Sequence, residues 1–447
     1  MKMSICQPIA PRIGIYTNSP PRFLFIFHTP KSFRPTACYF CFQIIFFVLT
    51  FVSECDTIEK NVRSLYNAMS HNFTPIKELM HELTECRGIP GADIIVSVDN
   101  TPVYRYFTGY SDREAGRKID ENTRYFLFSA SKPMTCASAL RLVERGLLDL
   151  NAPLYEYLPE FAHVLVDDGK NPPHEAKNPI TIRDLFCMTN GYSYEYSFGE
   201  HRISEMQGQP CPTVPTVKQL AKLPLRFEPH TNFAYGLGHD MLAAVCETVV
   251  GKKFRDYMKE VIFDPLGMSN SHMHVTEEDR SGKLAALYEQ ASDGTTTRHA
   301  SQDNEHIFGP EYDSGGAGVI SCPSDYIRFA MTMTARGTSP DGYELLRPET
   351  VELMRKPQLS AAELAGFAAC NLPGYSYGLG VRTHIDPSAS RRLSPVGEFG
   401  WDGAVGAFVS FDPENKISIV YMQSVYGTPH PINHKDILNT VYGCLGF

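Results

Sequence analysis

The twelve cysteines of this 447-residue chain lack the pairing and spacing that disulfide frameworks and metal sites require. Cys38 and Cys41 form one Cys-x-x-Cys with no second pair, and we interpret them as packing or lipid-facing residues. Eight others lie singly along the later chain: Cys86, Cys136, Cys187, Cys211, Cys246, Cys322, Cys370 and Cys444. Scattered thiols favour reduced cysteines and a cytoplasmic location over export.

Acidic residues are absent from the first 53 residues, which contain five basic ones. The whole chain has a formal charge of −9, so residues 54–447 carry −14 once the +5 of the first segment is set aside. A domain with this acidic balance is not expected to bind nucleic acid.

No apolar run is long enough to predict a membrane-spanning helix. The longest, residues 39–52, has fourteen residues, whereas a spanning helix needs about twenty. A membrane anchor, a targeting peptide and an upstream extension with initiation at Met69 all remain open, and the scattered thiols favour the extension. We therefore expect residues 1–68 to lie outside the fold, with membrane contact only if residues 38–53 are retained as an anchor, and with a membrane-anchored or exported protein as the alternative location.

Internal repeats and low-complexity tracts are also missing, and 43% hydrophobic with 20% charged residues is typical of a globular protein. Strand patterns occur near both ends, at 92–99, 103–108, 375–381, 404–411 and 417–423, whereas the middle is mainly helical. The pattern predicts an α+β domain over 69–447, in which an antiparallel sheet (about 69–155 and 314–447) is flanked by helices and carries a helical insertion (about 156–313). Nothing in the sequence indicates an oligomeric state.

The chain does contain one Ser-x-x-Lys, formed by Ser129 and Lys132 where a helix is predicted to begin. Apolar residues 126–128 precede it, and Pro133 is tolerated only in the first turn of a helix. Residues at i and i+3 share a helix face, so the hydroxyl and the amine can meet. A serine needs such a base to become a nucleophile, and a lysine acts as a base only where burial lowers its pKa. On this pattern alone, a capping serine followed by a solvated lysine is the competing interpretation.

Three separated stretches resemble the serine β-lactamases and penicillin-binding proteins. Phe128-Ser-Ala-Ser-Lys132 resembles their nucleophile motif, Phe233-Ala-Tyr235-Gly-Leu237 falls where they have Tyr-x-Asn, and Glu398-Phe-Gly-Trp401-Asp-Gly403-Ala404 falls where they have Lys-Thr-Gly. The resemblance is to the class C branch, covers about residues 72–447, and implies a β-lactamase/transpeptidase-like fold.

Carried over residue by residue, the resemblance implies that Ser129 is acylated and that Lys132 and Tyr235 share its proton. A phenol beside a lysine cation is expected to ionise more easily. The backbone N–H groups of Ser129 and Ala404 would form the oxyanion hole, and Gly403 would let the substrate lie against the strand. The resemblance implies no metal and no cofactor.

Two departures point to the family's esterase branch, the family VIII carboxylesterases. Leu237 replaces the asparagine of Tyr-x-Asn and Trp401 replaces the lysine of Lys-Thr-Gly, so polar groups for a β-lactam substrate are missing. Trp401 is expected to contact the substrate, and Asp402 would repel an anion if it pointed into the cleft. A serine hydrolase of short-chain carboxylic esters is the leading function.

Three alternative functions remain. A β-lactamase or a D-amino-acid peptidase would use the same site on a small ester or amide. An inactive binding or scaffold member is the alternative of another class, and the intact Ser129, Lys132 and Tyr235 argue against it.

Several residues invite other interpretations. Gly374-Tyr-Ser376-Tyr-Gly378 matches the nucleophile elbow of α/β-hydrolases, but a strand rather than a helix is predicted to follow it. His239, His272 and His274 have no cluster of metal-site spacing around them and are interpreted as loop or core residues.

We predict that deleting residues 1–68 leaves a soluble, active enzyme with reduced thiols. The reason is the change at about residue 54 from an acid-free basic segment to an acidic domain. Size-exclusion chromatography and ester hydrolysis by the truncated protein would test this, and an aggregated or inactive product would place the segment inside the fold.

Overall fold

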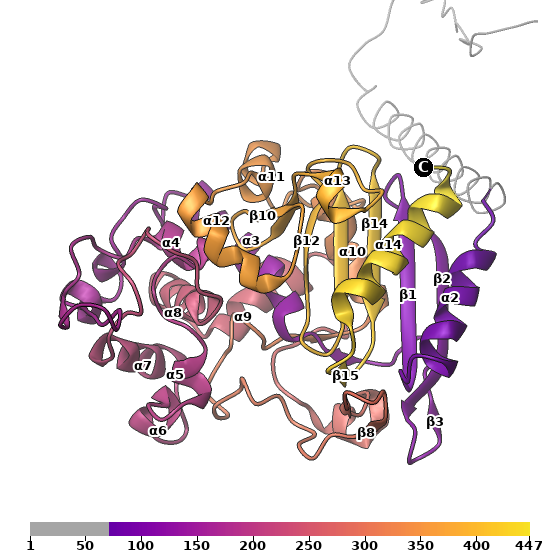
Figure 1. Ribbon diagram of the computed structural model, residues 1–447, viewed down its shortest axis with the longest axis horizontal. Coiled ribbons are helices and arrows are strands. Elements are labelled where there is room, and N and C mark those ends of the chain that lie inside the picture. Colours follow the sequence, from indigo (N-terminus) through magenta and orange to yellow (C-terminus); the bar gives the residue numbers. More distant parts are fainter. Residues whose placement is uncertain (1–70) are drawn as a thin grey trace, which may run out of the picture. The chain divides into compact units, whose positions relative to one another are not determined.

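An eight-stranded antiparallel sheet crosses the part of the protein that the computed structural model describes, residues 71–447. Its order is β10-β11-β12-β13-β14-β1-β2-β3, so strands from the two ends of the chain meet at the pairing of β1 with β14 (Figure 1). The bounds are β1 Gly91–Val98, β2 Thr101–Asp112, β3 Arg117–Lys118, β10 Tyr375–Tyr377, β11 Arg382–His384, β12 Phe399–Asp402, β13 Phe408–Asp412 and β14 Ile417–Met422. The predicted α+β class is confirmed.

The central strands β1, β13 and β14 are buried on both faces, which explains why they read as nearly continuous apolar runs. Along β1, Ile94 and Val96 point into one core and Ile95 into the other, because successive side chains in a strand alternate between faces. Helices α2 (Thr74–Glu85) and α14 (His430–Leu445) contact each other and cover the first face (Figure 1). Helix α10 (Pro323–Thr334) covers the second, with α3 (Lys132–Glu144) beyond it against β12.

The helical part, on the left of Figure 1, follows α3 in the chain. It contains α4 Ile182–Cys187, α5 Glu195–Phe198, α6 Ile203–Gln207, α7 Thr213–Lys218, α8 Gly238–Val250 and α9 Phe254–Met258. Later helices are α11 Pro348–Arg355, α12 Ala361–Phe367 and α13 Pro387–Ser390. Short strands make three further sheets: β4 Tyr125–Phe126 with β9 Ile320–Ser321, β5 Leu165–Val166 with β6 His174–Glu175, and β7 Tyr288–Gln290 with β8 Thr296–Arg298 and β15 Val425–Tyr426.

The first hairpin turns earlier than the sequence predicted. Asp99 and Asn100, not residues 100–102, form the turn, with φ values of 50° and 59° that aspartate and asparagine tolerate better than most residues. Pro102 lies inside β2, opposite Ser97, where the register shifts. A proline is accommodated there because a bulge relieves the demand for its missing N–H.

Two predicted strands were also too long. The strand expected at 404–411 begins only at Phe408, because residues 403–407 form a turn between β12 and β13. The strand expected at 375–381 ends at Tyr377, and a turn over residues 378–381 leads into β11. Ala404 therefore belongs to a turn and not to a strand.

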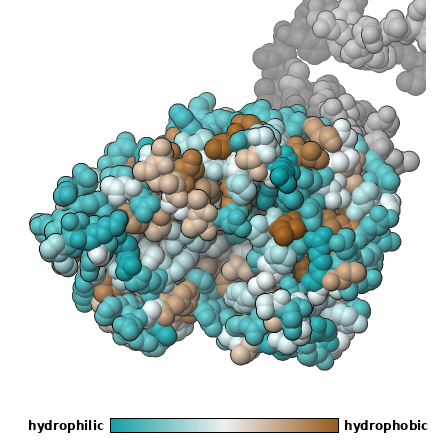
Figure 2. Space-filling model, viewed as in Figure 1, coloured by the Kyte–Doolittle hydropathy of each residue, from teal (hydrophilic) through white to brown (hydrophobic). Residues whose placement is uncertain are grey.

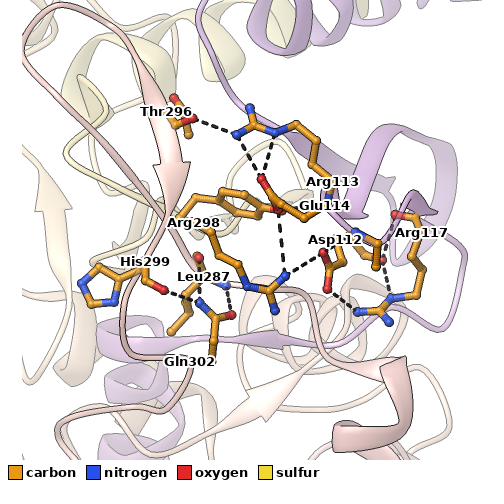
Figure 3. Close-up of polar contacts among 12 residues, drawn as sticks. Asp112, Arg113, Glu114, Arg117, Leu287, Thr296, Arg298, His299 and Gln302 are labelled. Atoms are coloured by element: carbon orange, nitrogen blue, oxygen red, sulfur yellow. Dashed lines mark hydrogen bonds and ion pairs between the residues drawn. The ribbon is translucent and has the colours of Figure 1, made fainter.

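A polar cluster joins the end of the β2–β3 hairpin to the β7–β8 hairpin (Figure 3). Asp112 accepts hydrogen bonds from Arg298 at 2.8 Å and Arg117 at 3.3 Å. Strand β15 pairs with β7, and the Val425 N–H of β15 donates to the Val405 carbonyl at 3.0 Å. The cluster thus anchors a small sheet that supports the turn after β12.

Within residues 71–447, no helix has the length and apolar character needed to cross a membrane. The expected extension 1–68, including its apolar run at 38–53, lies outside the described residues. All eight cysteines of the described region are free thiols.

Candidate active site

Ser129 lies in a short 3-10 turn, Phe128–Ser131, that runs directly into α3. Its neighbours on both sides are buried, whereas Ser129 is partly exposed. Phe128 has φ of 46°, a left-handed conformation that is rare for a bulky residue. Such strain persists only where the surroundings impose it, and here it sets the direction of the residue that follows.

The Lys132 amine lies at the centre of the site. The side chain is fully buried, and Nζ is 3.1 Å from Ser129 Oγ, 3.0 Å from the Tyr194 hydroxyl and 2.7 Å from the Gly316 carbonyl oxygen. A neutral amine satisfies all three contacts if it donates to Gly316 and Tyr194 and accepts the Ser129 proton. The predicted meeting of Ser129 and Lys132 is observed, and a solvated lysine is excluded.

Burial lowers the pKa of Lys132 to about 7, against the field of Asp240, which acts in the opposite direction. A buried ammonium loses its hydration, so the neutral amine is favoured relative to water. Near neutral pH a large fraction of Lys132 is thus able to accept a proton.

Two residues that the sequence did not single out complete the surroundings of Lys132. Tyr194 reaches the amine from the turn before α5, and Asp240 approaches from the first turn of α8. A side-chain carbon on Gly316 would lie 2.6 Å from Asp240 Oδ2, 3.2 Å from the Tyr194 hydroxyl and 3.4 Å from Lys132 Nζ. Only glycine lets these groups converge.

Tyr235 and Trp401 form the adjoining wall. The indole Nε1 of Trp401 donates to the Tyr235 hydroxyl at 2.8 Å, and Lys132 Nζ lies 4.7 Å from the centroid of the Tyr235 ring. Because the indole hydrogen occupies a lone pair of the phenol, the phenolic hydrogen is left to point elsewhere. Trp401 itself is only 5% exposed, so little of its indole is available to a substrate.

The expected ease of ionising Tyr235 is wrong. Burial raises the pKa of Tyr235, and the neighbouring Ser129 and Trp401 only partly oppose that shift. The expectation considered the charge of the lysine alone, whereas loss of hydration dominates for a buried phenol. Tyr235 is a hydrogen-bond donor at neutral pH, not a phenolate.

The turn after β12 lies against the residues that lead into Ser129. A side-chain carbon on Gly403 would be 2.3 Å from the Leu127 carbonyl oxygen, so glycine is required for this approach. Among residues 71–447, neither the Ala404 N–H nor the Ser129 N–H donates a hydrogen bond to another residue. Ser129 owes this to the first turn of a helix, where N–H groups have no intrahelical partner. Both amides are therefore unpaired among the described residues.

The Asp402 carboxylate is paired with other side chains and is not a free anion facing the substrate. Its Oδ1 accepts from the buried Arg382 at 2.7 Å and its Oδ2 is 3.5 Å from His434 Nδ1. These partners hold the pKa of Asp402 well below its usual range despite burial. Because its charge is paired, this carboxylate does not repel an anionic substrate as a free carboxylate would.

Apolar residues surround the Trp401 side of the site. Trp401 belongs to a buried cluster with Met188, Phe233, Phe367, Tyr375 and Tyr377, against which Tyr235, Cys370 and Leu372 pack while partly exposed. On the other side, the His306 ring lies 5.0 Å from the rings of both Tyr194 and Phe198. The protein face in Figure 2 is hollowed between the helical part and the sheet part.

The competing candidates occupy structural positions. Ser376 is 2% exposed on β10, where it pairs with Thr383 of β11, so no helix follows it. His272 binds Asp279 at 2.7 Å and His274 binds Asp313 at 2.8 Å, while His239 is fully buried. Within residues 71–447, no group of three histidines, cysteines or carboxylates has the geometry to hold a metal ion.

The sequence matches the beta-lactamase family over residues 76–441. Protein Rv1367c of Mycobacterium tuberculosis is 30% identical over 70% of this chain and 80% of its own length. Esterase EstB of Burkholderia gladioli is 29% identical, covering 72% of this chain and 82% of EstB. Lovastatin esterase of Penicillium rubens is 29% identical, covering 67% and 78% respectively.

Solved structures share the fold at lower sequence identity. EstCE1, described as a hydrolase with promiscuous acyltransferase activity, superposes with a TM-score of 0.70 and 24% identity, covering 83% of this chain and 98% of EstCE1. Unliganded simvastatin synthase of Aspergillus terreus gives a TM-score of 0.67 and 23% identity, covering 82% and 97%.

We predict that the reactivity of Ser129 rises with pH and levels off above pH 7, because only the neutral Lys132 amine can take the serine proton. The rate of labelling by a fluorophosphonate should show a rising limb with a midpoint near pH 7. His306 cannot supply this limb, since burial lowers its pKa to about 3. Lys132→Arg, which stays protonated, should label slowly at every pH, and a flat wild-type profile between pH 5.5 and 8.5 would contradict the assignment.

Proposed function

This chain belongs to the beta-lactamase family and is a serine hydrolase, and we propose that it cleaves short-chain carboxylic esters through an acyl-enzyme on Ser129. The observation that carries the proposal is the contact of 3.1 Å between Ser129 Oγ and a fully buried Lys132 amine. That contact provides a nucleophile and a base whose pKa suits neutral pH.

Acylation starts with attack of Ser129 Oγ on the ester carbonyl carbon. The serine proton moves to Lys132 Nζ, and the carbonyl electron pair moves onto the oxygen. The N–H groups of Ser129 and Ala404 stabilise that oxyanion in a partly enclosed site, where such hydrogen bonds are strongest. Asp240 then faces a charged Lys132, so the same field that raises the lysine pKa stabilises this step.

The alkoxide leaving group needs a proton when the tetrahedral intermediate collapses. Lys132 holds the proton taken from Ser129. It passes this proton to the alkoxide directly, or returns it to Tyr235 when the Tyr235 hydroxyl donates while the Trp401 N–H occupies its oxygen, and in either case Lys132 is neutral again. Tyr194, 3.0 Å from Lys132 Nζ, offers a second phenol on the other side of the amine. The ester C–O bond breaks, the alcohol departs, and Ser129 carries the acyl group.

Deacylation reverses the roles. Water attacks the acyl carbon and gives its proton to the neutral Lys132, and Ser129 Oγ leaves and is reprotonated. An alcohol in place of water would complete an acyl transfer by the same steps. Several relatives are named as acyltransferases, which makes transfer the second candidate for the same acyl-enzyme.

A neutral substrate suits the surroundings better than an anionic one. Trp401 stands where the resemblance placed a lysine, the nearby Arg382 is fully buried and paired with Asp402, and the partly exposed Cys370 and Leu372 are apolar or weakly polar. Each apolar group covered contributes up to about 1.5 to 3 kcal/mol. Trp401 itself offers no charge to a carboxylate, whereas an acyl chain can cover apolar surface.

We predict that Ser129→Ala loses at least about 10³-fold in ester hydrolysis, because the nucleophile is removed while the fold is kept. Ser376→Ala should keep most activity, since Ser376 is buried on β10. Mass spectrometry after fluorophosphonate treatment should find the adduct on Ser129, and an adduct on Ser376 would overturn the site.

We also predict that p-nitrophenyl butyrate is preferred over nitrocefin in kcat/KM. Each missing charge-assisted hydrogen bond to the β-lactam carboxylate lowers the rate by about ten- to a hundredfold. Trp401→Lys should shift the ratio toward nitrocefin. Trp401→Phe is the matched control, because it removes the N–H donor to Tyr235 without adding a cation. Equal wild-type rates on the two substrates, or an unchanged ratio in Trp401→Lys, would refute the role of this position.

A further inference from the structure

The turn that carries the Ala404 amide is held by its carbonyl groups. Ala404 O accepts from His430 Nε2 at 3.0 Å, Val405 O from the Val425 N–H at 3.0 Å, and Gly406 O from His434 Nε2 at 3.2 Å. Three consecutive carbonyls are therefore fixed from outside the turn. The Ala404 N–H, as noted above, is left without an acceptor among the described residues.

His430 is the first residue of α14, and its ring has a defined hydrogen-bond direction. A carbonyl oxygen can only accept, so Nε2 carries the hydrogen and Nδ1 is the acceptor. Nδ1 lies 2.7 Å from Thr428 Oγ1, which in turn accepts from Gln423 Nε2 at 3.1 Å. Successive hydrogen bonds thus run from Gln423 through Thr428 and His430 to the Ala404 carbonyl, and each donor has an acceptor.

His434, one turn further along α14, repeats the contact on the other side of the turn. Its ring stacks on that of His430 with centroids 5.5 Å apart and an angle of 18°. Its second nitrogen faces Asp402, the last residue of β12, at 3.5 Å. The two rings therefore connect α14 both to the turn and to the strand that precedes it.

At Gly406 the turn packs closely against the Gln423 side chain. It has φ of 98°, and a side-chain carbon would lie 2.2 Å from Gln423 Nε2. Gln423 also accepts from the Tyr421 hydroxyl at 2.8 Å, so its side chain cannot move freely away. The turn can shift only if this buried network shifts with it.

We propose that His430, supported by His434, is a positioning residue that holds the Ala404 amide in the place where it binds the oxyanion. The inference rests on the proposed function, because it concerns the oxyanion hole of the Ser129 site. In this proposal, the start of α14 supports the active site, whereas the rest of the helix packs against α2 and the sheet.

The role follows from how oxyanion holes act. Their donors stabilise the transition state only when they already point at the oxygen. A shifted amide therefore loses much of the stabilisation that would be lost if the amide were deleted. Removing the His430 contact frees the Ala404 carbonyl and the peptide plane next to the amide. The ester carbonyl in the ground state depends much less on this geometry than the charged tetrahedral state does.

His430→Leu is the central test, with p-nitrophenyl butyrate as substrate and phenylboronic acid as the probe of the tetrahedral anionic state. We expect kcat/KM to fall by about tenfold to a hundredfold and the inhibition constant of the boronic acid to rise by a similar factor. His430→Gln can place an amide N–H near the position of Nε2 and should restore most of both values. Thr428→Val, which removes the hydroxyl that orients the ring, should give an intermediate loss.

Tyr442→Phe is the matched control on the same helix. It deletes a hydroxyl that donates to Asp412 at 2.6 Å and touches no part of the turn, so it should lower Tm while leaving kcat/KM and boronate affinity unchanged. If His430→Leu is folded and keeps wild-type kcat/KM and boronate affinity, the positioning role is wrong. If His430→Gln is as impaired as His430→Leu, the N–H donor is not what matters. Failure of the proposed function itself would be seen separately, as a wild type that is neither active nor labelled at Ser129.

Discussion

Burial of one amine controls how this site is built. A buried lysine loses several kcal/mol of hydration as a cation, so it remains in the fold only where its polar contacts are met and its neutral form is accessible. Lys132 meets that condition with three oxygen partners. These come from separate places: Ser129 from the turn before α3, Tyr194 from the helical part, and Gly316 from the segment before β9. The site therefore exists only when the helical part and the sheet part are packed together.

Close backbone approach on the two sides of Ser129 is the second requirement. Gly316 lets Asp240, Tyr194 and Lys132 converge on one side, and Gly403 lets the turn after β12 touch the Leu127 carbonyl on the other. Neither position tolerates a side-chain carbon without moving backbone or a buried carboxylate. The nucleophile is thus placed by two glycines and by the left-handed Phe128, and its own contacts are few.

The parts of the site that the sequence could predict are local. Ser129 and Lys132 lie three residues apart at a helix start, and helix geometry alone brings them together; Tyr235, Trp401 and Ala404 were identified by resemblance. Tyr194 and Asp240 gave no signal, because they meet Lys132 only through tertiary packing. Asp240 could have been suspected as a carboxylate on the apolar helix after Tyr235, but nothing marks Tyr194 within its tyrosine-rich loop.

The fold follows the same division between local and non-local signals. Its class and the strand at 417–423, observed as β14, were predictable from the residue pattern. Most of the turn at 403–407 was predicted as part of a strand because residues 404–411 form a short, largely apolar run. Its actual conformation depends on contacts with α14 and β15, which no local pattern reveals.

Replacing a cation by Trp401 also changes what must lower the pKa of Lys132. A second cation nearby would disfavour the ammonium, but here burial lowers the pKa of Lys132 and Asp240 acts against it. Complete burial is therefore what keeps the amine basic and unprotonated near neutral pH. If bulk water reached Lys132, the pKa of the amine would rise and the site would lose its base. Substrates that cover Lys132 with apolar groups are therefore favoured. The apolar cluster around Trp401 thus follows from the same constraint. Trp401 takes the place of a charged lysine, and its indole also helps to exclude the water that would stabilise the ammonium form of Lys132.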